Sequence, residues 1–261
     1  MDFLPTPSWL SLIVVCTFVL GAQHSVANDT VFVAGATGRT GSSILKQLTQ
    51  SGYNVIALAR DVSTVKENIP RVTWIEGNVR DIDSLRRGIA KAQVVISAVG
   101  ATTGTGPNAP EFVDFAGTRN LADVAKEHRI RQFVLIASGR SGSHSDHSTR
   151  EFMGYGRYFK TKGEEYLKAS GVPFTILGAA GLSAKPAGEV GIRFFSRAEY
   201  SATTQSTDES AVIAIGDLAA VAVSALSDPA SLFKAFAVMN DPKRTPGAWR
   251  KDFATIDTNW Q

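Results

Sequence analysis

Short apolar runs alternate with segments of helical spacing along the chain. The helices between the runs are marked by apolar positions three and four residues apart, such as Ile44, Leu45 and Leu48. Buried strands separated by helices predict an α/β fold in one domain, a doubly wound parallel sheet with helices on both faces. The apolar runs that we interpret as strands lie at residues 31–33, 55–59, 72–75, 94–97, 133–137, 173–177 and 235–239.

A glycine-rich turn joins the first strand to the first helix. The letters GATGRTG place Gly35, Gly38 and Gly41 at equal spacing between them. A sharp turn and a close approach of the main chain to a pyrophosphate both require positions without Cβ, and the helix N-terminus offers unpaired N–H groups to the anion. The turn therefore predicts a dinucleotide-binding Rossmann sheet. The residues that we expect to receive the phosphates are Gly35, Thr37, Gly38, Arg39, Thr40 and Gly41.

Arg60 indicates which dinucleotide binds. A free ribose 2′-OH is usually held by an acidic residue at the end of the second strand, whereas a 2′-phosphate requires a cation there. Arg60 occupies this position and Arg39 can reach the same phosphate, so we expect NADP(H) rather than NAD(H). Asp61 follows one residue later and could instead cap the next helix, and the two arginines could simply be solvated at the rim.

Three later strand ends complete the expected cofactor site. Asn78 and Val79 follow the third strand, where they could contact adenine, although a turn capped by Asp81 explains the same residues. Small residues follow the fourth and sixth strands, where the cofactor and its nicotinamide ring could lie against main chain. These small residues are Ala98, Val99, Gly100 and Ala180.

The segments between the strands give further expectations. We predict helices at residues 61–68, 110–128, 155–170 and 216–226, and a polar irregular region at 183–210 with an edge strand at 193–195. Gly117, in the middle of a helix, indicates close approach to another backbone or to the cofactor. The inward face of the 110–128 helix is expected to hold Phe112, Phe115, Leu121, Val124 and Ala125.

Composition narrows the functional classes. The net charge is only +3 and there is no basic stripe with interleaved aromatic residues, so nucleic-acid binding is not implied. The single cysteine, Cys16, lies before the predicted domain, which excludes thiol chemistry and disulfides within it. His144, Asp146 and His147 lie in a Ser- and Gly-rich loop without evident supporting residues, and we predict no metal site.

The first 27 residues carry an apolar stretch from Trp9 to Leu20, followed by Ser25-Val26-Ala27 with small residues at signal-peptidase positions. We therefore expect residues 1–27 to be a signal peptide or N-terminal membrane anchor, and the protein to be exported or membrane-associated. The stretch lacks a preceding Lys or Arg and is short for a span, so a cytoplasmic protein is the alternative. Residues 28–240 form the expected NAD(P)-binding domain, and 241–261 a tail docking through Trp249, Phe253 and Trp260.

Several motifs together resemble the atypical short-chain dehydrogenase/reductases, in particular the NmrA-like and biliverdin- or flavin-reductase-like NAD(P)H-binding group. The motifs are GATGRTG, the turn from Gly77 to Asp81, ISAVG, GTRNLADVAKEHRIRQFVLIAS and KTKGEEYLKASGVPFTI. The resemblance covers residues 30–240 and implies a cofactor lying across the carboxyl ends of the strands.

The resemblance also implies catalytic candidates, in two registers. Short-chain reductases pair a Tyr with a Lys four residues later, which fits Tyr158 and Lys162, and add a Ser after the fifth strand, which fits Ser138. The subgroup's pattern instead aligns its functional Lys with Lys160 and leaves Gly156 at the tyrosine position. We favour Lys160 as the ribose ligand, with Ser138 and Tyr158 as candidate proton donors. The chain departs from the subgroup at Gly178, where an Arg is usual.

The sequence therefore predicts an NADP(H)-binding reductase. Hydride would pass to a small carbonyl, quinone, flavin or tetrapyrrole-like acceptor, with the redox chemistry supplied by the cofactor. The alternative is a dinucleotide-binding sensor or assembly factor without turnover, which the glycine at position 156 would suit. Isomerase or epimerase chemistry with bound NAD is disfavoured by Arg60.

Overall fold

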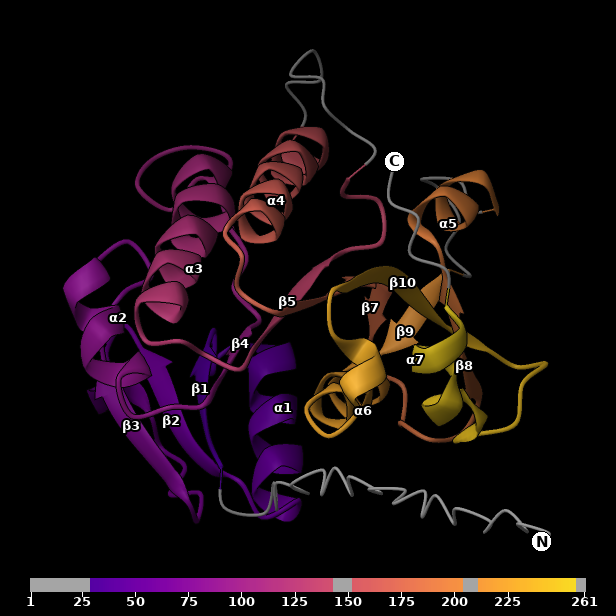
Figure 1. Cartoon of the computed structure of the whole chain (residues 1–261), viewed down its shortest axis with the longest axis horizontal. Coiled ribbons are helices and arrows are strands. Elements are labelled where there is room, and N and C mark those ends of the chain that lie inside the picture. Colours follow the sequence, from indigo (N-terminus) through magenta and orange to yellow (C-terminus); the bar gives the residue numbers. More distant parts are fainter. Residues whose placement is uncertain (1–28, 143–151, 204–210, 257–261) are drawn as a thin grey trace, which may run out of the picture.

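The computed structural model describes residues 29–142, 152–203 and 211–256. A sheet of eight strands runs through the middle of the molecule (Figure 1). Seven strands are parallel, and only β8 pairs antiparallel, with β10, at one edge. The spatial order is β3 (Val72–Glu76), β2 (Asn54–Ala59), β1 (Thr30–Ala34), β4 (Val94–Ser97), β5 (Gln132–Ser138), β6 (Phe174–Ala179), β10 (Lys234–Asp241) and β8 (Gly191–Phe195).

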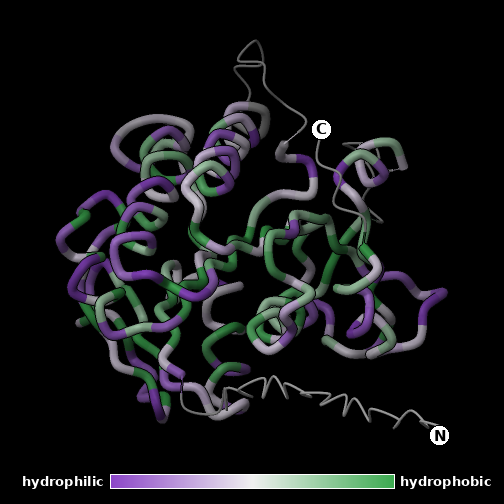
Figure 2. Tube along the Cα trace, in the orientation of Figure 1, coloured by the Kyte–Doolittle hydropathy of each residue, from purple (hydrophilic) through white to green (hydrophobic). Residues whose placement is uncertain are grey.

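Helices cover both faces of this sheet, which confirms the predicted fold class. One apolar core lies between the sheet and α1 (Arg39–Gln50), α6 (Ile215–Ala225) and α7 (Asp252–Thr255). A second core lies under α2 (Ile82–Ile89), α3 (Gly117–Glu127) and α4 (Phe152–Ala169). Figure 2 shows the strands as hydrophobic trace and the outer helix turns as more hydrophilic, as expected where a parallel sheet is covered on both faces.

The strand order reverses beside β1. The chain proceeds outward from β1 through β2 to β3, then returns to place β4 on the other side of β1. Val31 of β1 consequently lies opposite Val55 on one side and Val94 on the other. Such a reversal opens a crevice at the carboxyl ends of the two central strands, where α/β proteins bind ligands.

The described part of the predicted polar region, residues 183–203, and the residues flanking that region are more regular than the sequence indicated. β7 (Gly181–Ser183) and β9 (Val212–Ala214) form a small parallel sheet, and α5 (Arg197–Thr203) follows the edge strand β8. The edge strand itself was predicted. The small sheet and α5 were not, because elements of three to seven residues give little periodic signal.

Two other expectations need correction. The predicted 61–68 helix is only a 3₁₀ turn, η2 (Val62–Thr64), and Phe112, predicted to face inward, is 43% exposed. The reason for the second error is a π-helical segment, η3 (Glu111–Ala116), which precedes α3 and shifts the helical phase of Phe112. Gly117 does make a close approach, but to the side chain of Val79: a Cβ there would lie 2.7 Å from Val79 Cγ2.

The C-terminal residues that the structure describes pack on the domain. Trp249 and Phe253 are 4% and 1% exposed and join Phe194 and Phe236 in one aromatic cluster. The 3₁₀ turns η4 (Pro229–Ser231) and η5 (Ala248–Lys251) lie beside β10 in sequence. The segment 1–27, the His144–His147 loop and Trp260 are outside the described residues. No helix within the described ranges combines the length and apolar character that crossing a bilayer requires.

Candidate functional site

The glycine turn between β1 and α1 lies at the reversal of the sheet. Gly35 has φ +79°, and a Cβ on it would lie 2.7 Å from the carbonyl of Ala98 at the end of β4. A Cβ on Gly41 would overlap the carbonyl oxygen of Gly35. The turn is closed by the Gly38 N–H, which donates to Gly35 O at 3.0 Å. Only glycine fits at Gly35 and Gly41, so α1 packs directly against the strand end.

The N-terminus of α1 is prepared for an anion. The cap residue Gly38 makes no side-chain cap bond, and the first turn contains no acidic residue. Its main-chain N–H groups and the positive end of the helix dipole are therefore not neutralised by the helix itself. Thr37, Gly38 and Arg39 are exposed, and Thr40 is buried beneath them. A pyrophosphate fits this bare, electropositive turn.

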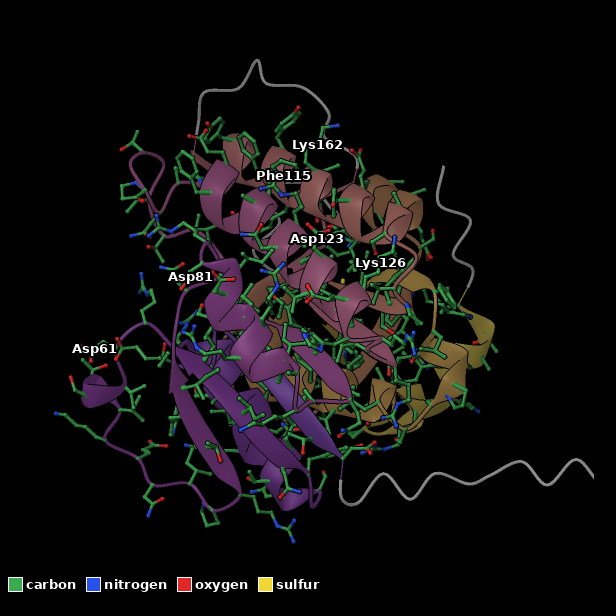
Figure 3. The ribbon with its side chains drawn as sticks, turned by 60° about the vertical axis from the view of Figure 1, so that its left-hand side comes forward. Asp61, Asp81, Phe115, Asp123, Lys126 and Lys162 are labelled. Carbon is green, nitrogen blue, oxygen red and sulfur yellow. The ribbon has the colours of Figure 1, made fainter. Side chains whose placement is uncertain are left out.

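A pocket of about 200 Å³ extends from the glycine turn toward β2 and β3. Arg60, directly after β2, is exposed at its rim, whereas Arg39 is not among its lining residues. Asp61 points elsewhere: its carboxylate accepts from Ser63 N at 2.9 Å and caps η2, at the molecule's edge in Figure 3. Of the two charged residues directly after β2, Arg60 therefore lines the pocket and Asp61 does not.

Asn78 and Val79 contribute the pocket's wall at the end of β3. Val79 is 7% exposed, and its carbonyl accepts from Asn120 Nδ2 at 3.0 Å. Asn78 Oδ1 accepts from the Arg80 N–H at 3.0 Å, and Asp81 caps α2 through Asp83 N. The capped turn is therefore confirmed, and the same turn lines the pocket. Contact of Asn78 and Val79 with adenine stays a prediction.

A second pocket of about 420 Å³ continues the first across the ends of β4, β5 and β6. The two share Ala98, Val99 and Gly100, the small residues after β4. The second pocket also contains Thr40, Ser138, Lys160 and Ala180. The predicted cofactor residues therefore line one continuous cleft, except Arg39 and Gly41, which lie in the adjoining turn.

Lys160 projects from α4 toward this cleft. Its Nζ lies 2.6 Å from Asp114 Oδ1, and a Cβ placed on Gly100 would be 3.4 Å from the same Nζ. Asp114 is nearly fully buried in the π-helical segment and also accepts from Ala101 N at 3.3 Å. The carboxylate therefore holds the lysine ammonium beside the shared floor of both pockets.

Tyr158 and Lys162 face a different way. Lys162 Nζ donates to Glu165 Oε2 at 2.8 Å on the outer surface of α4 (Figure 3). Tyr158 packs edge-on against Phe159 at 5.1 Å, with Lys162 Nζ 5.6 Å from its ring centroid. Neither residue lines either of the two pockets, whereas Ser138 and Lys160 do. The structure thus brings together Ser138 and Lys160, the residues of the alignment that uses Lys160, and not Tyr158 and Lys162.

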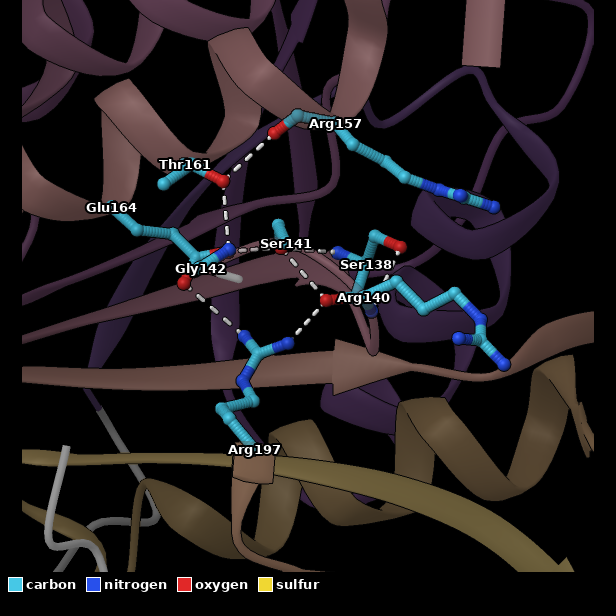
Figure 4. Close-up of polar contacts among 8 residues, drawn as sticks. All are labelled: Ser138, Arg140, Ser141, Gly142, Arg157, Thr161, Glu164 and Arg197. Atoms are coloured by element: carbon cyan, nitrogen blue, oxygen red, sulfur yellow. Dashed lines mark hydrogen bonds and ion pairs between the residues drawn. The ribbon is translucent and has the colours of Figure 1, made fainter. Parts of the chain in front are cut away.

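A buried ion pair that the sequence did not reveal lies behind the second pocket. Arg197 Nη2 of α5 lies 3.2 Å from Glu164 Oε2 of α4, and both side chains are almost completely buried. Arg197 also donates to the carbonyl of Ser138, and Ser141 Oγ donates to Glu164 (Figure 4). Burial lowers the pKa of Arg197, while the Glu164 charge raises it. The network fixes the segment after β5.

The network also accounts for Gly178. This residue lies within β6, and a Cβ on it would overlap the Arg197 guanidinium. The guanidinium of Arg197 from α5 thus occupies the space above Gly178. Spacing alone does not reveal this contact, because the two residues lie far apart in sequence in a region without clear periodicity.

Strand order, glycine turn and continuous cleft define an α/β protein with a dinucleotide-binding Rossmann sheet. Comparison with known families supports this class directly. Residues 35–229 match the model of the NAD(P)H-binding family, and the chain belongs to that family. Its cofactor is accordingly a nicotinamide dinucleotide, and the resemblance stated from the sequence is confirmed at this level.

Three curated relatives give the family more detail. An uncharacterized chloroplastic protein of Arabidopsis thaliana is 31% identical over 251 residues, covering 88% of this chain and 74% of its own. Sanguinarine reductase of Eschscholzia californica is 36% identical over 149 residues, covering 56% and 52%. Photosystem II assembly factor Ycf39 of Cyanophora paradoxa is 27% identical over 181 residues, covering 68% and 53%. The chain therefore spans about half the length of the latter two.

Solved structures share the fold at low identity. The oxidoreductase ylbE of Lactococcus lactis has a TM-score of 0.66 at 21% identity, covering 87% of this chain and 95% of its own. The anaerobilin reductase ChuY of Escherichia coli O157:H7 has a TM-score of 0.65 at 18% identity, covering 84% and 100%. At these identities the likeness establishes the reductase-like fold.

Proposed function

We propose that the protein is an NADPH-dependent reductase that transfers hydride to a small carbonyl, quinone, flavin or tetrapyrrole-like acceptor. The observation that carries the proposal is the continuity of the two pockets through Ala98, Val99 and Gly100. The first pocket suits an adenosine half, and the second has room for a nicotinamide half beside an acceptor. When bound, the cofactor supplies the hydride.

The residues of the chain hold the cofactor in position and supply a proton to the acceptor. The glycine turn receives the phosphates, and Lys160, held by Asp114, offers its ammonium to a ribose hydroxyl beside Gly100. Ser138 Oγ accepts from the Arg140 N–H at 3.2 Å and retains its own proton for an acceptor oxygen or nitrogen. Arg60 at the rim favours the 2′-phosphate, which selects NADPH over NADH.

The test is a titration of the purified protein with NADPH and NADH, followed by a panel of quinones, flavins and tetrapyrroles. Tight NADPH binding with oxidation by at least one class of acceptor supports the reductase. The name of one relative, sanguinarine reductase, supports a reductase function. No binding of either dinucleotide at millimolar concentration would refute both the cofactor and the activity.

A second function has an observation in its favour. Tyr158 lines neither pocket, and position 156, where the subgroup's tyrosine falls, is glycine. A dinucleotide-binding sensor or assembly factor requires no proton donor, and one relative is named an assembly factor. Tight NADPH binding without oxidation across the whole panel would favour this function.

For the N-terminal segment we propose a targeting role, with membrane attachment through residues 1–27 as the alternative. The apolar stretch ending in small residues and the chloroplastic relatives support delivery to a compartment. A reporter fused behind these residues tests it. A cytoplasmic, soluble reporter would contradict both forms of the proposal.

A further inference from the structure

The loop between β4 and η3 borders the first pocket at both of its ends. Ala101 and Thr102, where the loop begins, and Asn108, where it ends, all line the pocket of about 200 Å³ that also contains the glycine turn. The residues between them, 103–107, are exposed. The loop therefore supplies a wall of this pocket that the strand ends do not.

The backbone around Asn108 is restrained on both sides. Ala109 is 2% exposed, and its N–H donates to Gly106 O at 3.0 Å. Pro110 is buried, and the ring of Pro107 fixes a backbone angle on the other side of Asn108. These restraints reduce the entropy that Asn108 loses when its side chain is ordered by a ligand.

The side-chain amide of Asn108 has no hydrogen-bond partner among the residues that the structure describes, although the residue is half-buried. The pocket lining contains one other amide side chain, that of Asn78. Asn78 Oδ1 already accepts from the Arg80 N–H at 3.0 Å within its own turn. Of the two amides, Asn108 therefore offers both its carbonyl oxygen and its NH₂ group to a ligand.

The rest of the pocket indicates which part of a dinucleotide would meet this amide. The glycine turn and Arg60 suit the phosphates, whereas Leu58, Val79 and Val113 line the pocket with apolar surface for a flat base. The polar edge of a base that leaves water requires hydrogen-bond partners. An Asn side chain pairs with adenine in a bidentate way, its carbonyl accepting from the N6 amino group and its NH₂ donating to N7.

We propose that Asn108 recognises the base of the cofactor, binding the polar edge of adenine through its amide and selecting adenine over a 6-oxo purine. A 6-oxo base such as hypoxanthine presents an acceptor where adenine presents a donor, so one amide cannot satisfy both positions. The inference rests on the dinucleotide binding of the family and not on hydride transfer. It applies equally to a reductase and to a sensor.

Matched coenzymes test the proposal. Fluorescence titration of the purified full-length protein compares NADPH with the reduced form of nicotinamide hypoxanthine dinucleotide phosphate, and NADH with its reduced hypoxanthine analogue. In both pairs the adenine coenzyme should bind about tenfold or more tightly than its analogue, as expected for a bidentate pair. Because the 2′ substituent is the same within each pair, the comparison reports on the base alone.

Variants assign the discrimination to Asn108. Asn108→Leu should lose most of it through weaker binding of the adenine coenzymes, with unchanged thermal unfolding of the unliganded protein, and Asn108→Ala repeats the test if the leucine variant does not fold. Asn108→Lys should shift the preference toward hypoxanthine, because a cationic donor suits the O6 and N7 acceptors. Thr105→Val, in the exposed part of the same loop and outside the pocket lining, is the control and should retain the full discrimination.

Two results would overturn the inference. Equal affinities within both coenzyme pairs in the wild type would show that the edge of the base is not recognised. Discrimination that persists in Asn108→Leu and Asn108→Ala would assign the base to another residue, and its loss in Asn78→Ala would place it at the end of β3. If the discrimination depends on Asn108 but no acceptor oxidises NADPH, the inference stands and only the reductase function fails.

Discussion

Lys160 and Asp114 are joined across two helices at the floor of the cleft, with Nζ and Oδ1 2.6 Å apart. The carboxylate is 2% exposed and the lysine 25%. Asp114 belongs to the π-helical segment η3. The same segment therefore positions this carboxylate and explains why the prediction that Phe112 faces inward was wrong. A π-helical turn at a functional site is a recurrent association.

Exchange of Lys160 for Met should lower NADPH affinity about tenfold or more, since a charged contact to the ribose is lost. Lys162→Met is the matched control two residues away, because Lys162 pairs with Glu165 on the outer face of α4. Fluorescence titration with NADPH measures both. A larger effect at Lys162 than at Lys160 would establish the other register.

The same exchange leaves the Asp114 carboxylate buried without its cation, which should lower the free energy of unfolding by about 1–3 kcal/mol. The double variant Lys160→Met/Asp114→Asn should recover much of the stability but not the NADPH affinity. Urea unfolding separates the two effects. Recovery of affinity in the double variant would show that Lys160 acts only on folding.

Two alanine substitutions in the glycine turn should fail in different ways. Gly41→Ala places a methyl group against the Gly35 carbonyl and should destabilise the fold or prevent it. Gly38→Ala meets only Gly35 O, at 3.3 Å, and should fold while binding NADPH more weakly, because the methyl group enters the phosphate position. Thermal unfolding measures the first effect and NADPH titration the second. Equal destabilisation of the two variants would contradict the prediction that the two glycines have different roles.

Substitution of Arg60 should alter coenzyme preference. Arg60→Gln is expected to reduce the ratio of NADPH to NADH affinity about tenfold, because the cation nearest the 2′-phosphate is removed. Arg39→Gln should have the smaller effect, since Arg39 lies outside the pocket lining. Parallel titrations give both ratios, and an unchanged ratio in the double variant would exclude recognition of the 2′-phosphate by these residues.

The buried pair of Arg197 and Glu164 should be intolerant of single substitutions. Arg197→Met leaves the Glu164 charge unpaired in the interior and should lower the free energy of unfolding by about 3–5 kcal/mol. Arg197→Met/Glu164→Leu removes both charges and should recover part of that loss. Chemical denaturation of the wild type, of Arg197→Met, of Glu164→Leu and of the double variant measures the coupling. Simple additivity of the two changes would contradict a direct interaction.

Lys168 makes stability depend on pH. Burial lowers its pKa to about 7, opposed by the charge of Glu164. Because the folded-state pKa lies below the ordinary value of 10.5, the unfolded chain binds more protons between these values, and this group's contribution to stability rises with pH from about 7 to 10.5.

Lys168→Met removes this contribution. The free energy of unfolding of the variant minus that of the wild type should be larger at pH 6 than at pH 9. The difference should be about 1–2 kcal/mol after allowance for the partial solvation of the side chain. Urea unfolding at the two pH values measures the difference. If the variant and the wild type differed in free energy of unfolding by the same amount at both pH values, Lys168 would have an ordinary pKa in the folded protein.

The fold and the dinucleotide end of the cleft were predictable, because their signals are local. A strand, three glycines and a helix lie within residues 30–50, and the order of apolar runs gives the sheet. The end of the cleft formed by the second pocket was not, since Arg140, Arg157 and Arg197 come from separate elements that meet only in three dimensions. Asp114 gave no sequence signal either, because its role depends on the π-helical phase of η3.

The way Arg197 fills the space above Gly178 has a practical consequence for redesign. Arg197 connects α5 to Glu164 of α4 and to the Ser138 carbonyl after β5. Transfer of α4 alone onto a related scaffold would therefore leave Glu164 without this cation. Exchange of acceptor preference between relatives should therefore require transfer of residues 138–200 as one block.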